Sequence, residues 1–128
     1  MSDAATPDTA ILYVEDDDTG RALGCYNLRK AGFAVDEAKD GADALELFCP
    51  ARHVLVITDL KMPRVSGLAV LKHVKQRSPQ TPVIITTALG EMALADHALR
   101  AGASAIISKP FARDHLLGAV QKAISQRG

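Results

Sequence analysis

The sequence predicts an α/β protein with a doubly wound, five-stranded parallel sheet. Five short runs rich in β-branched residues recur along the chain, and most are apolar without alternation, which is typical of strands covered on both faces. The segments between these runs carry apolar residues at helical spacing. Because each interval leaves room for one helix, the expected order is strand then helix, repeated five times.

Each element is predicted from a short stretch of sequence. The strand runs are "ILYV" from residue 11, "FAV" from 33, "VLVIT" from 54, "VIIT" from 83 and "AIIS" from 105. The first helix, 18–31, is inferred from its length and position, because Gly20 and Gly24 lower its helical propensity. Later helices are indicated by apolar stripes, namely Leu45 and Phe48, then Leu68, Leu71 and Val74, then Leu117, Val120 and Ile124. The turns "RKAG", "KDG", "RSPQTP" and "RAGAS" separate them, and the last helix should end near Ser125.

Length and composition restrict the class of protein. The 128 residues suggest a single domain, here 10–128, after a disordered lead-in over 1–9 that has no signal-peptide pattern. An apolar content of 48%, a charged content of 23% and a net charge of zero fit a soluble globular protein. A neutral domain with few aromatic residues argues against direct binding of nucleic acid, and no apolar run is long enough to span a membrane.

The cysteines and histidines carry no motif. Cys25 and Cys49 are expected to be small core or boundary residues in a reducing cytoplasm. Metal-ligand spacing is absent among the four histidines, so surface positions are expected for His53, His73, His97 and His115.

Polar side chains follow all five predicted strands, but Asp36 and Glu37 after the second would lie at a sheet edge, remote from the other four ends. Open α/β sheets bind ligands beyond the carboxyl ends of their strands, where the strand order reverses. Glu15 and Asp16 follow the first strand, Asp59 the third, Thr87 the fourth and Lys109 the fifth. We expect these three carboxylates, one hydroxyl and one ammonium to share one edge of the sheet.

Each of these residues also has a purely structural interpretation. Acids after a strand often cap the next helix, and we assign Asp17 and Asp18 to that role. Taken singly, the other residues could be caps, turn residues or surface groups. Taken together, three crowded carboxylates repel one another unless a cation joins them. Oxygen ligands from short acids suit Mg²⁺, and an ammonium opposite the metal invites a phosphoryl group.

The residues resemble the receiver domain of two-component response regulators, including those of the nitrogen-regulator class and of hybrid histidine kinases. The resemblance extends from about residue 10 to 124 and rests on "YVEDD", "ITDLKMP", "SGL", "TTA", "AGAS" and "KPF" in order. It implies the flavodoxin-like fold with strand order 2-1-3-4-5. It also implies a phosphoacceptor in a phosphorelay rather than a conventional turnover enzyme.

The family's roles can be carried over residue by residue. Asp59 is similar to the phosphoacceptor that takes a phosphoryl group from a histidine kinase or phosphotransfer protein. The resemblance implies that Asp16 and Asp59 bind Mg²⁺ directly, Glu15 through a water, and Lys61 through its backbone carbonyl. Lys109 would pair with the phosphoryl oxygens, and its bond to Pro110 would be cis.

The switch is expected to begin at Thr87, which turns toward the phosphoryl group after transfer. The change would pass through the 88–94 loop, where Gly90 allows movement, to the face formed by the fourth helix, fifth strand and fifth helix. That face would control an output domain or downstream partner, or support a homodimer formed on phosphorylation. Ile106 stands where the family often has Tyr or Phe, so an aromatic rotamer cannot be the switch. Leu89, two residues after Thr87, is a position that modulates acyl phosphate hydrolysis in the family.

Other functions remain open at this point. "DDDTG" approaches the opening of haloacid-dehalogenase-like phosphatases, but Thr19 stands one residue too early. A flavodoxin-type electron carrier shares the fold, yet its phosphate would meet an acidic edge here. The main alternative is a pseudo-receiver, an interaction module without phosphorylation, although none of the site acids nor the lysine is lost.

Overall fold

The computed structural model describes residues 9–126, in which five strands alternate with five helices. The strands are β1 (Ala10–Val14), β2 (Val35–Ala38), β3 (His53–Asp59), β4 (Val83–Thr87) and β5 (Ala105–Ser108). The helices are α1 (Asp18–Lys30), α2 (Gly41–Leu47), α3 (Gly67–Arg77), α4 (Met92–Arg100) and α5 (Arg113–Ser125). The predicted lead-in, apart from Thr9, and the last two positions of the predicted domain lie outside the described residues.

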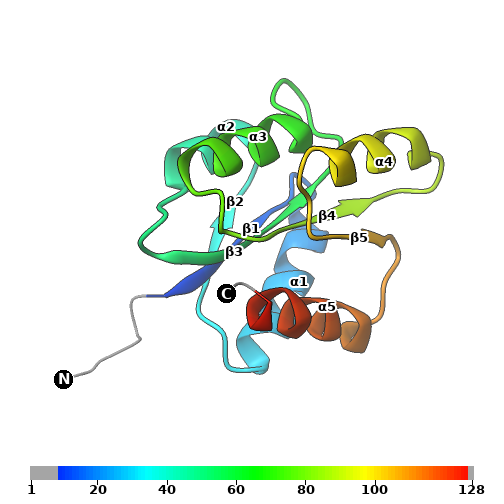
Figure 1. The fold of residues 1–128 in the computed structure, drawn as a ribbon. Helices are drawn as coiled ribbons and strands as arrows, with labels where there is room; N and C mark the ends of the chain where they lie inside the picture. The colour runs from blue at the N-terminus through cyan, green and yellow to red at the C-terminus, as the bar shows by residue number, and fades with distance from the viewer. Residues whose placement is uncertain (1–8, 127–128) are drawn as a thin grey trace.

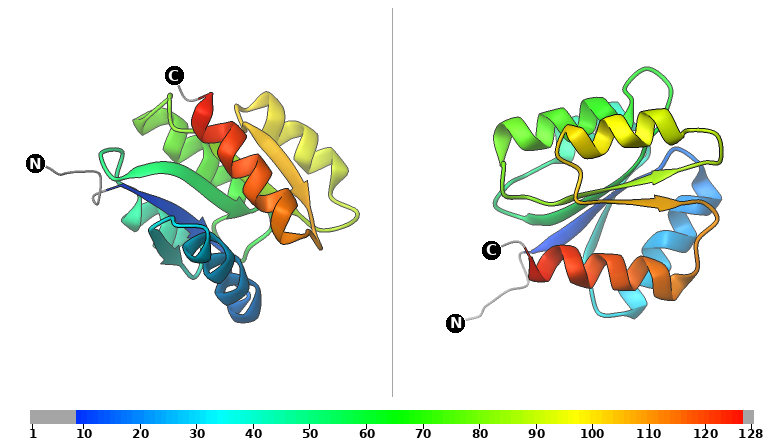
Figure 2. Two further views of the ribbon diagram at one scale, coloured as in Figure 1. Left: turned by 90° about the horizontal axis from the view of Figure 1, so that it is seen from below. Right: turned by 45° about the vertical axis from the view of Figure 1, so that its right-hand side comes forward.

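All four strand pairings are parallel, and the sheet order is β2-β1-β3-β4-β5. This order confirms the doubly wound, flavodoxin-like fold. Helices α2, α3 and α4 cover one face of the sheet, while α1 and α5 cover the other (Figures 1 and 2). The chain places β2 on one side of β1 and then β3, β4 and β5 on the other side. The strand order therefore reverses between β1 and β3, and a ligand can enter at the carboxyl ends of these two strands.

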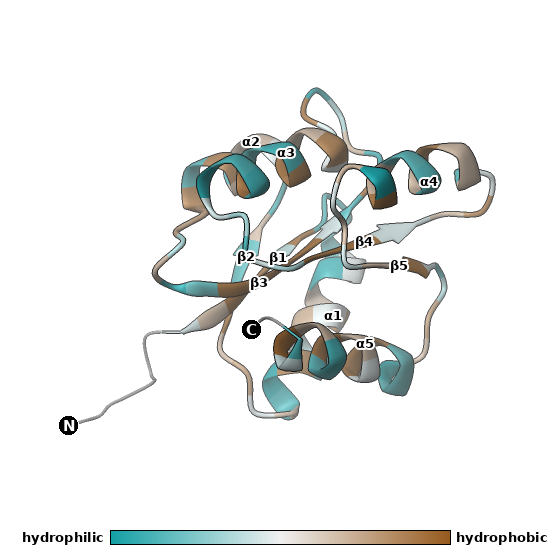
Figure 3. Cartoon of the chain, viewed as in Figure 1, coloured by the Kyte–Doolittle hydropathy of each residue, from teal (hydrophilic) through white to brown (hydrophobic). Residues whose placement is uncertain are grey.

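The sheet separates two hydrophobic clusters. Successive residues of a strand point to opposite faces, so Leu12 and Val56 pack under α2 and α3, whereas Ile11 and Ile57 pack under α1 and α5. The apolar strands form the middle of the molecule in the hydropathy view (Figure 3). Burial on both faces explains why these strands read as continuous apolar runs rather than alternating ones.

Helix α1 begins where the sequence predicted an N-terminal cap. The side chain of Asp17 accepts a hydrogen bond of 2.7 Å from the backbone N–H of Gly20, and Asp18 lies in the first turn. Between residues 9 and 126, every helix falls short of the length and apolar character needed to cross a membrane.

The second strand lies two residues later than predicted. Val35–Ala38 forms β2, so Asp36 and Glu37 lie within the strand, and the expected start at Phe33 is wrong. Charged residues are tolerated because β2 is an edge strand, where their carboxylates reach arginines of neighbouring elements. Of the cysteines, Cys25 is buried as expected, but Cys49 is exposed in the loop after α2.

The prediction that all four histidines lie at the surface is wrong for His53, which is 1% exposed. Its Nδ1 accepts a hydrogen bond from the backbone N–H of Cys49 at 3.0 Å. Its Nε2 lies 2.8 Å from Oδ2 of Asp36, to which it therefore donates. Arg52 donates to the same carboxylate at 2.6 and 3.0 Å, so His53 is a satisfied core histidine. His73 is half-buried in α3, and the other two are exposed.

Candidate functional site

Four strand ends place the predicted site residues on one edge of the sheet. Asp59 is the last residue of β3, and Thr87 is the last residue of β4. Glu15 follows β1 directly, and its backbone N–H extends the ladder by bonding to the carbonyl of Ala38. Lys109 follows β5, and its N–H bonds to the carbonyl of Thr87 at 2.7 Å. Each side chain is therefore positioned by backbone that belongs to the sheet.

An ammonium joins two of the carboxylates. The Nζ atom of Lys109 lies 2.6 Å from Oε1 of Glu15 and 3.2 Å from Oδ2 of Asp59. Glu15 and Asp59 are 4% and 8% exposed, so both acids are withdrawn from water. Lys109 comes from the other end of the chain, and it partly balances their charge in this position. The peptide bond between Lys109 and Pro110 is cis, as the resemblance implied.

Glu15, Asp16 and Asp59 form a cluster that fits a divalent cation. Each offers one carboxylate oxygen, and these oxygens lie within 4.8 Å of one another. Asp16 is exposed while the other two are buried, so the cluster is open to solvent on one side. Hard carboxylate ligands in a site that also admits water are typical of Mg²⁺. Three carboxylates and one ammonium leave an excess of negative charge that a divalent cation would neutralise.

The pKa values of the site residues reflect this excess of negative charge. Burial and then the charge of Glu15 raise the pKa of Asp59 from 3.8 to about 6, against the opposing effect of Lys109. Burial and a hydrogen bond with Glu15 raise the pKa of Asp16. Burial lowers the pKa of the Lys109 ammonium, but the hydrogen bond to Glu15 and the charge of Asp59 outweigh it, so its pKa is raised. The protein therefore holds anions together at a cost that a bound cation would remove.

The loop after β3 fixes the Asp59 carboxylate. Its Oδ1 accepts a hydrogen bond from the backbone N–H of Leu60 at 3.0 Å, which leaves Oδ2 facing Lys109. The loop then returns, and the N–H of Gly67 bonds to the carbonyl of Leu60 at 2.8 Å. A side chain at Gly67 would stand 2.2 Å from the backbone oxygen of Asp59, so only glycine permits this approach.

The other three predicted residues, Thr87, Ile106 and Lys61, lie on β4, on β5 and in the loop after β3. Thr87 is 2% exposed, one position beyond Thr86, which is the register partner of Asp59. Ile106 of β5 is half-buried and packs on the hydrophobic cluster that includes Ala98 of α4, so it belongs to the predicted output face. Lys61 lies in the exposed loop after Asp59, and its carbonyl as a metal ligand stays a prediction.

The loop between β4 and α4 is open to solvent. Gly90 has a φ of +93°, a conformation that favours glycine, and nothing lies within 4 Å of its missing side chain. Leu89 is 98% exposed, so in this state its side chain covers no part of the acidic cluster. Leu89 and Gly90 therefore make few packed contacts with the rest of the domain.

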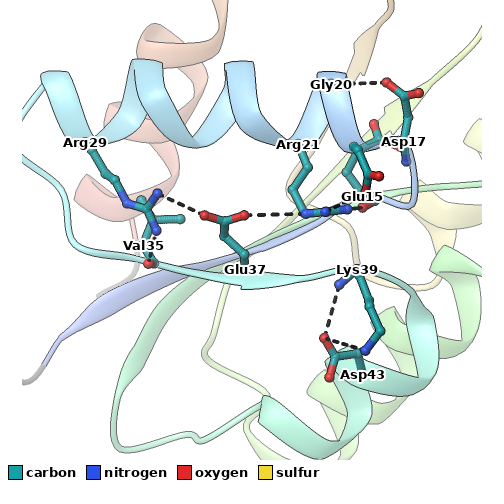
Figure 4. A network of polar contacts seen from close by, with 10 residues as sticks. Glu15, Asp17, Gly20, Arg21, Arg29, Val35, Glu37, Lys39 and Asp43 are labelled. Atoms are coloured by element: carbon teal, nitrogen blue, oxygen red, sulfur yellow. Dashed lines mark hydrogen bonds and ion pairs between the residues drawn. The ribbon is translucent and has the colours of Figure 1, made fainter.

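Sequence reasoning missed Arg21, which contacts the site through the backbone. Its Nη1 donates to the carbonyl of Glu15 at 2.8 Å, and its Nε forms an ion pair with Glu37 at 3.4 Å (Figure 4). The available signal was weak, because an arginine three residues after Asp18 indicates only a helical ion pair. The contact with Glu15 depends on how α1 meets the sheet.

Comparison with known proteins gives the same family for most of the chain. The family model described as "Response regulator receiver domain" matches residues 11–121. The chain is 37% identical to the regulatory protein AtoC of Escherichia coli (strain K12), covering 89% of this chain and 25% of that protein. It is 36% identical to the chemotaxis protein CheY of Bacillus subtilis (strain 168), covering 90% of this chain and 97% of that protein.

Solved structures agree in fold. A response regulator receiver domain protein from Clostridium thermocellum matches with a TM-score of 0.89 and 30% identity, covering 93% of this chain and 96% of that one. The receiver domain of NtrX from Brucella abortus matches with a TM-score of 0.85 and 32% identity, covering 90% and 98%. The chain spans about a quarter of the length of relatives such as AtoC and the DNA-binding transcriptional regulator NtrC of Escherichia coli. This chain belongs to the receiver domain family of two-component response regulators.

Proposed function

We propose that this chain is a working phosphoacceptor, in which Asp59 receives a phosphoryl group in a Mg²⁺-dependent reaction. The observation that carries the proposal is the position of Asp59: it is buried, its Oδ2 lies 3.2 Å from Lys109, and it clusters with Glu15 and Asp16. An interaction module would have no need to keep three repelling acids and one ammonium together.

The donor is a phosphohistidine on a kinase or phosphotransfer protein. An oxygen of the Asp59 carboxylate attacks phosphorus, the P–N bond breaks, and the electron pair of that bond leaves with the imidazole nitrogen. The product is an acyl phosphate on Asp59. This transfer needs little covalent help, so positioning and charge neutralisation supply most of the catalysis.

Each residue contributes a separate part of that environment. Glu15, Asp16 and Asp59 would hold Mg²⁺, together with the carbonyl of Lys61, and the metal would neutralise charge on the phosphoryl oxygens. Lys109 is already paired with Asp59 and would stay beside the phosphoryl group after transfer. The N–H of Leu60 fixes the carboxylate before attack.

Signal output follows from the extra charge and acceptor oxygens on Asp59. Thr87 would turn toward the phosphoryl group, and the change would reach the face of α4, β5 and α5 through Gly90 and Ile106. An output domain or partner protein in the cytoplasm would read that face. The domain assists its own phosphorylation and dephosphorylation and is not a conventional turnover enzyme.

The test is intact mass after incubation with acetyl phosphate, with and without Mg²⁺. We expect a Mg²⁺-dependent gain of one phosphoryl group in the wild-type protein and none in Asp59→Asn, which is nearly isosteric. Asp96→Asn is the matched control, because this exposed aspartate of α4 pairs only with Arg100 among the described contacts. Circular dichroism verifies that each variant is folded.

Failure to gain a phosphoryl group from acetyl phosphate and from a phosphorylated histidine kinase would favour the pseudo-receiver alternative. Equal uptake by Asp59→Asn would show that the acceptor is another residue. The two results are distinct, because the first concerns the wild-type protein and the second concerns only the variant.

A further inference from the structure

The turn that carries Glu15 and Asp16 is clamped from the second strand through an arginine. Three nitrogens of Arg21 are engaged: Nη1 with the carbonyl of Glu15, Nη2 with Asp18, and Nε with Glu37 of β2. Figure 4 shows Glu37 on one side of the guanidinium and Glu15 on the other. The planar fork of an arginine suits this spacing, because it offers several donors in fixed directions.

Glu37 is itself held in place. Its second carboxylate oxygen accepts a hydrogen bond of 2.9 Å from Arg29, and Arg29 also donates to the carbonyl of Val35 at 2.9 Å (Figure 4). A continuous series of ion pairs and hydrogen bonds thus runs from the edge strand, through α1, to the backbone of Glu15. The Arg21 side chain is 17% exposed, so it is more protected than an ordinary surface ion pair.

Every polar atom of Glu15 has a hydrogen-bond partner, and Arg21 is one of these partners. Its N–H bonds to Ala38 of β2, its carbonyl accepts from Arg21, and its two carboxylate oxygens accept from Lys109 and from the N–H of Asp17. Strand β2 therefore holds Glu15 twice, once through Ala38 and once through Arg21. The carbonyl of Glu15 also belongs to the peptide bond that leads to Asp16, so its orientation sets where the Asp16 carboxylate begins.

We propose that Arg21 is a positioning residue for the metal site, acting through the carbonyl of Glu15 and held in turn by Glu37. This inference rests on the proposed function, because the cation to be positioned is the one that phosphorylation requires. Arg21 donates to no carboxylate of the acidic cluster. Its effect is to keep the Glu15–Asp16 turn facing Asp59.

The direction of the change in metal affinity distinguishes a positioning role of Arg21 from a purely electrostatic one. Removing a cation near three carboxylates should by itself strengthen metal binding, since the guanidinium repels the metal. Loss of an outer partner that orients the ligands should instead weaken metal binding, by about tenfold. The two explanations therefore predict opposite changes for Arg21→Ala.

The first measurement is binding of Mn²⁺ by electron paramagnetic resonance, because the chain has no tryptophan to report binding by fluorescence. Mn²⁺ takes the same oxygen ligands as Mg²⁺. We expect about tenfold weaker binding in Arg21→Ala and a similar loss in Arg21→Lys, because one ammonium cannot span the partners of a guanidinium. Asp18→Asn, which removes only an ion pair whose acid is 89% exposed, should bind as the wild type does.

The second measurement is the initial rate of phosphoryl uptake from acetyl phosphate against Mg²⁺ concentration. In Arg21→Ala the half-saturating Mg²⁺ concentration should rise about tenfold, while the rate at saturating Mg²⁺ stays near the wild-type value. A merely structural residue would lower the melting temperature without moving the half-saturating concentration. If Arg21→Ala does not fold, Glu37→Gln tests the same connection and should shift Mn²⁺ affinity in the same direction.

The outcomes are separable from those of the proposed function. Wild-type protein that neither binds Mn²⁺ nor gains a phosphoryl group overturns the proposed function, and this inference with it. A wild-type protein that does both, with an Arg21→Ala variant of equal or higher Mn²⁺ affinity, overturns the inference alone. Wild-type affinity in Arg21→Lys would also overturn it, because the bridge from Glu37 to the carbonyl of Glu15 would then not be needed for metal binding.

Discussion

The partly buried cluster of Asp36, Arg52 and His53 allows a stability prediction that is independent of the proposed phosphoacceptor site. Hydrogen bonds from Arg52, and then from His53, outweigh partial burial and lower the pKa of Asp36 from 3.8 to about 2. We consider Asp36→Asn, which keeps the shape of the side chain and removes its charge. Asn can still accept a hydrogen bond from His53, so the change mainly removes the ionised partner of Arg52.

The pKa shift sets the size of the effect. A fall from 3.8 to about 2 corresponds to at most about 2 kcal/mol of folding free energy at neutral pH. The carboxylate side chain is 31% exposed, so solvent screening reduces the expected loss to about 1–2 kcal/mol. Because the folded-state pKa of Asp36 is depressed, its stabilisation is present above the unfolded value and is lost as pH falls toward the folded value.

Urea unfolding of both proteins at several pH values measures this difference. The gap in unfolding free energy between wild type and Asp36→Asn should be full near pH 7 and about half as large near pH 3. Phosphoryl uptake should be unchanged, because Asp36 contacts none of the acidic cluster in the described structure. A gap that stays constant between these pH values would refute the assignment of the stabilisation to ionised Asp36.

Three further substitutions test the site and the packing. Lys109→Ala should retain Mn²⁺ binding but lower the rate of phosphoryl uptake by about 100-fold, measured by intact mass, because it removes the ammonium beside Asp59. Gly24→Ala would place a methyl group 2.2 Å from the hydroxyl of Tyr13, and should cost about 1–3 kcal/mol in thermal unfolding. Its cost should be smaller in a Tyr13→Ala background, and equal costs in both backgrounds would contradict the clash. Leu71→Ala, at a fully buried position of α3, should cost about 2–5 kcal/mol in urea unfolding, and a loss below 1 would contradict its place in the core.

Most elements could be predicted because they depend on burial, whereas the strand order was implied only by the family resemblance. Strands covered on both faces must be apolar throughout, so β1, β3 and β4 are visible as uninterrupted runs. The first helix was predicted at 18–31 and ends at Lys30, and the last was predicted to end near Ser125, where it does end. Strand β2 was misplaced because two of its four residues are acids, and only their tertiary partners make a strand favourable there.

The candidate site was predictable to a similar degree and for a related reason. Glu15 and Lys109 follow strands directly, Asp59 ends a strand and Asp16 comes one residue after Glu15, so the parallel sheet brings them to one edge. Arg21 was not predictable, because its contact with Glu15 depends on the angle between α1 and the sheet, which no local pattern specifies. The same limit applies to His53, whose partners are 4 and 17 residues away in the chain.

Because the sheet divides the interior into two hydrophobic clusters, neighbouring residues of β5 pack against different helices. Ile106 packs with the helices of one layer and Ile107 with those of the other, although they are adjacent in the chain. Substitutions in the α4 layer can therefore leave the packing around Tyr13, on the other face of the sheet, largely undisturbed. Under the proposed function, this separation would allow the surface that partners contact to change while the residues around Asp59 are kept.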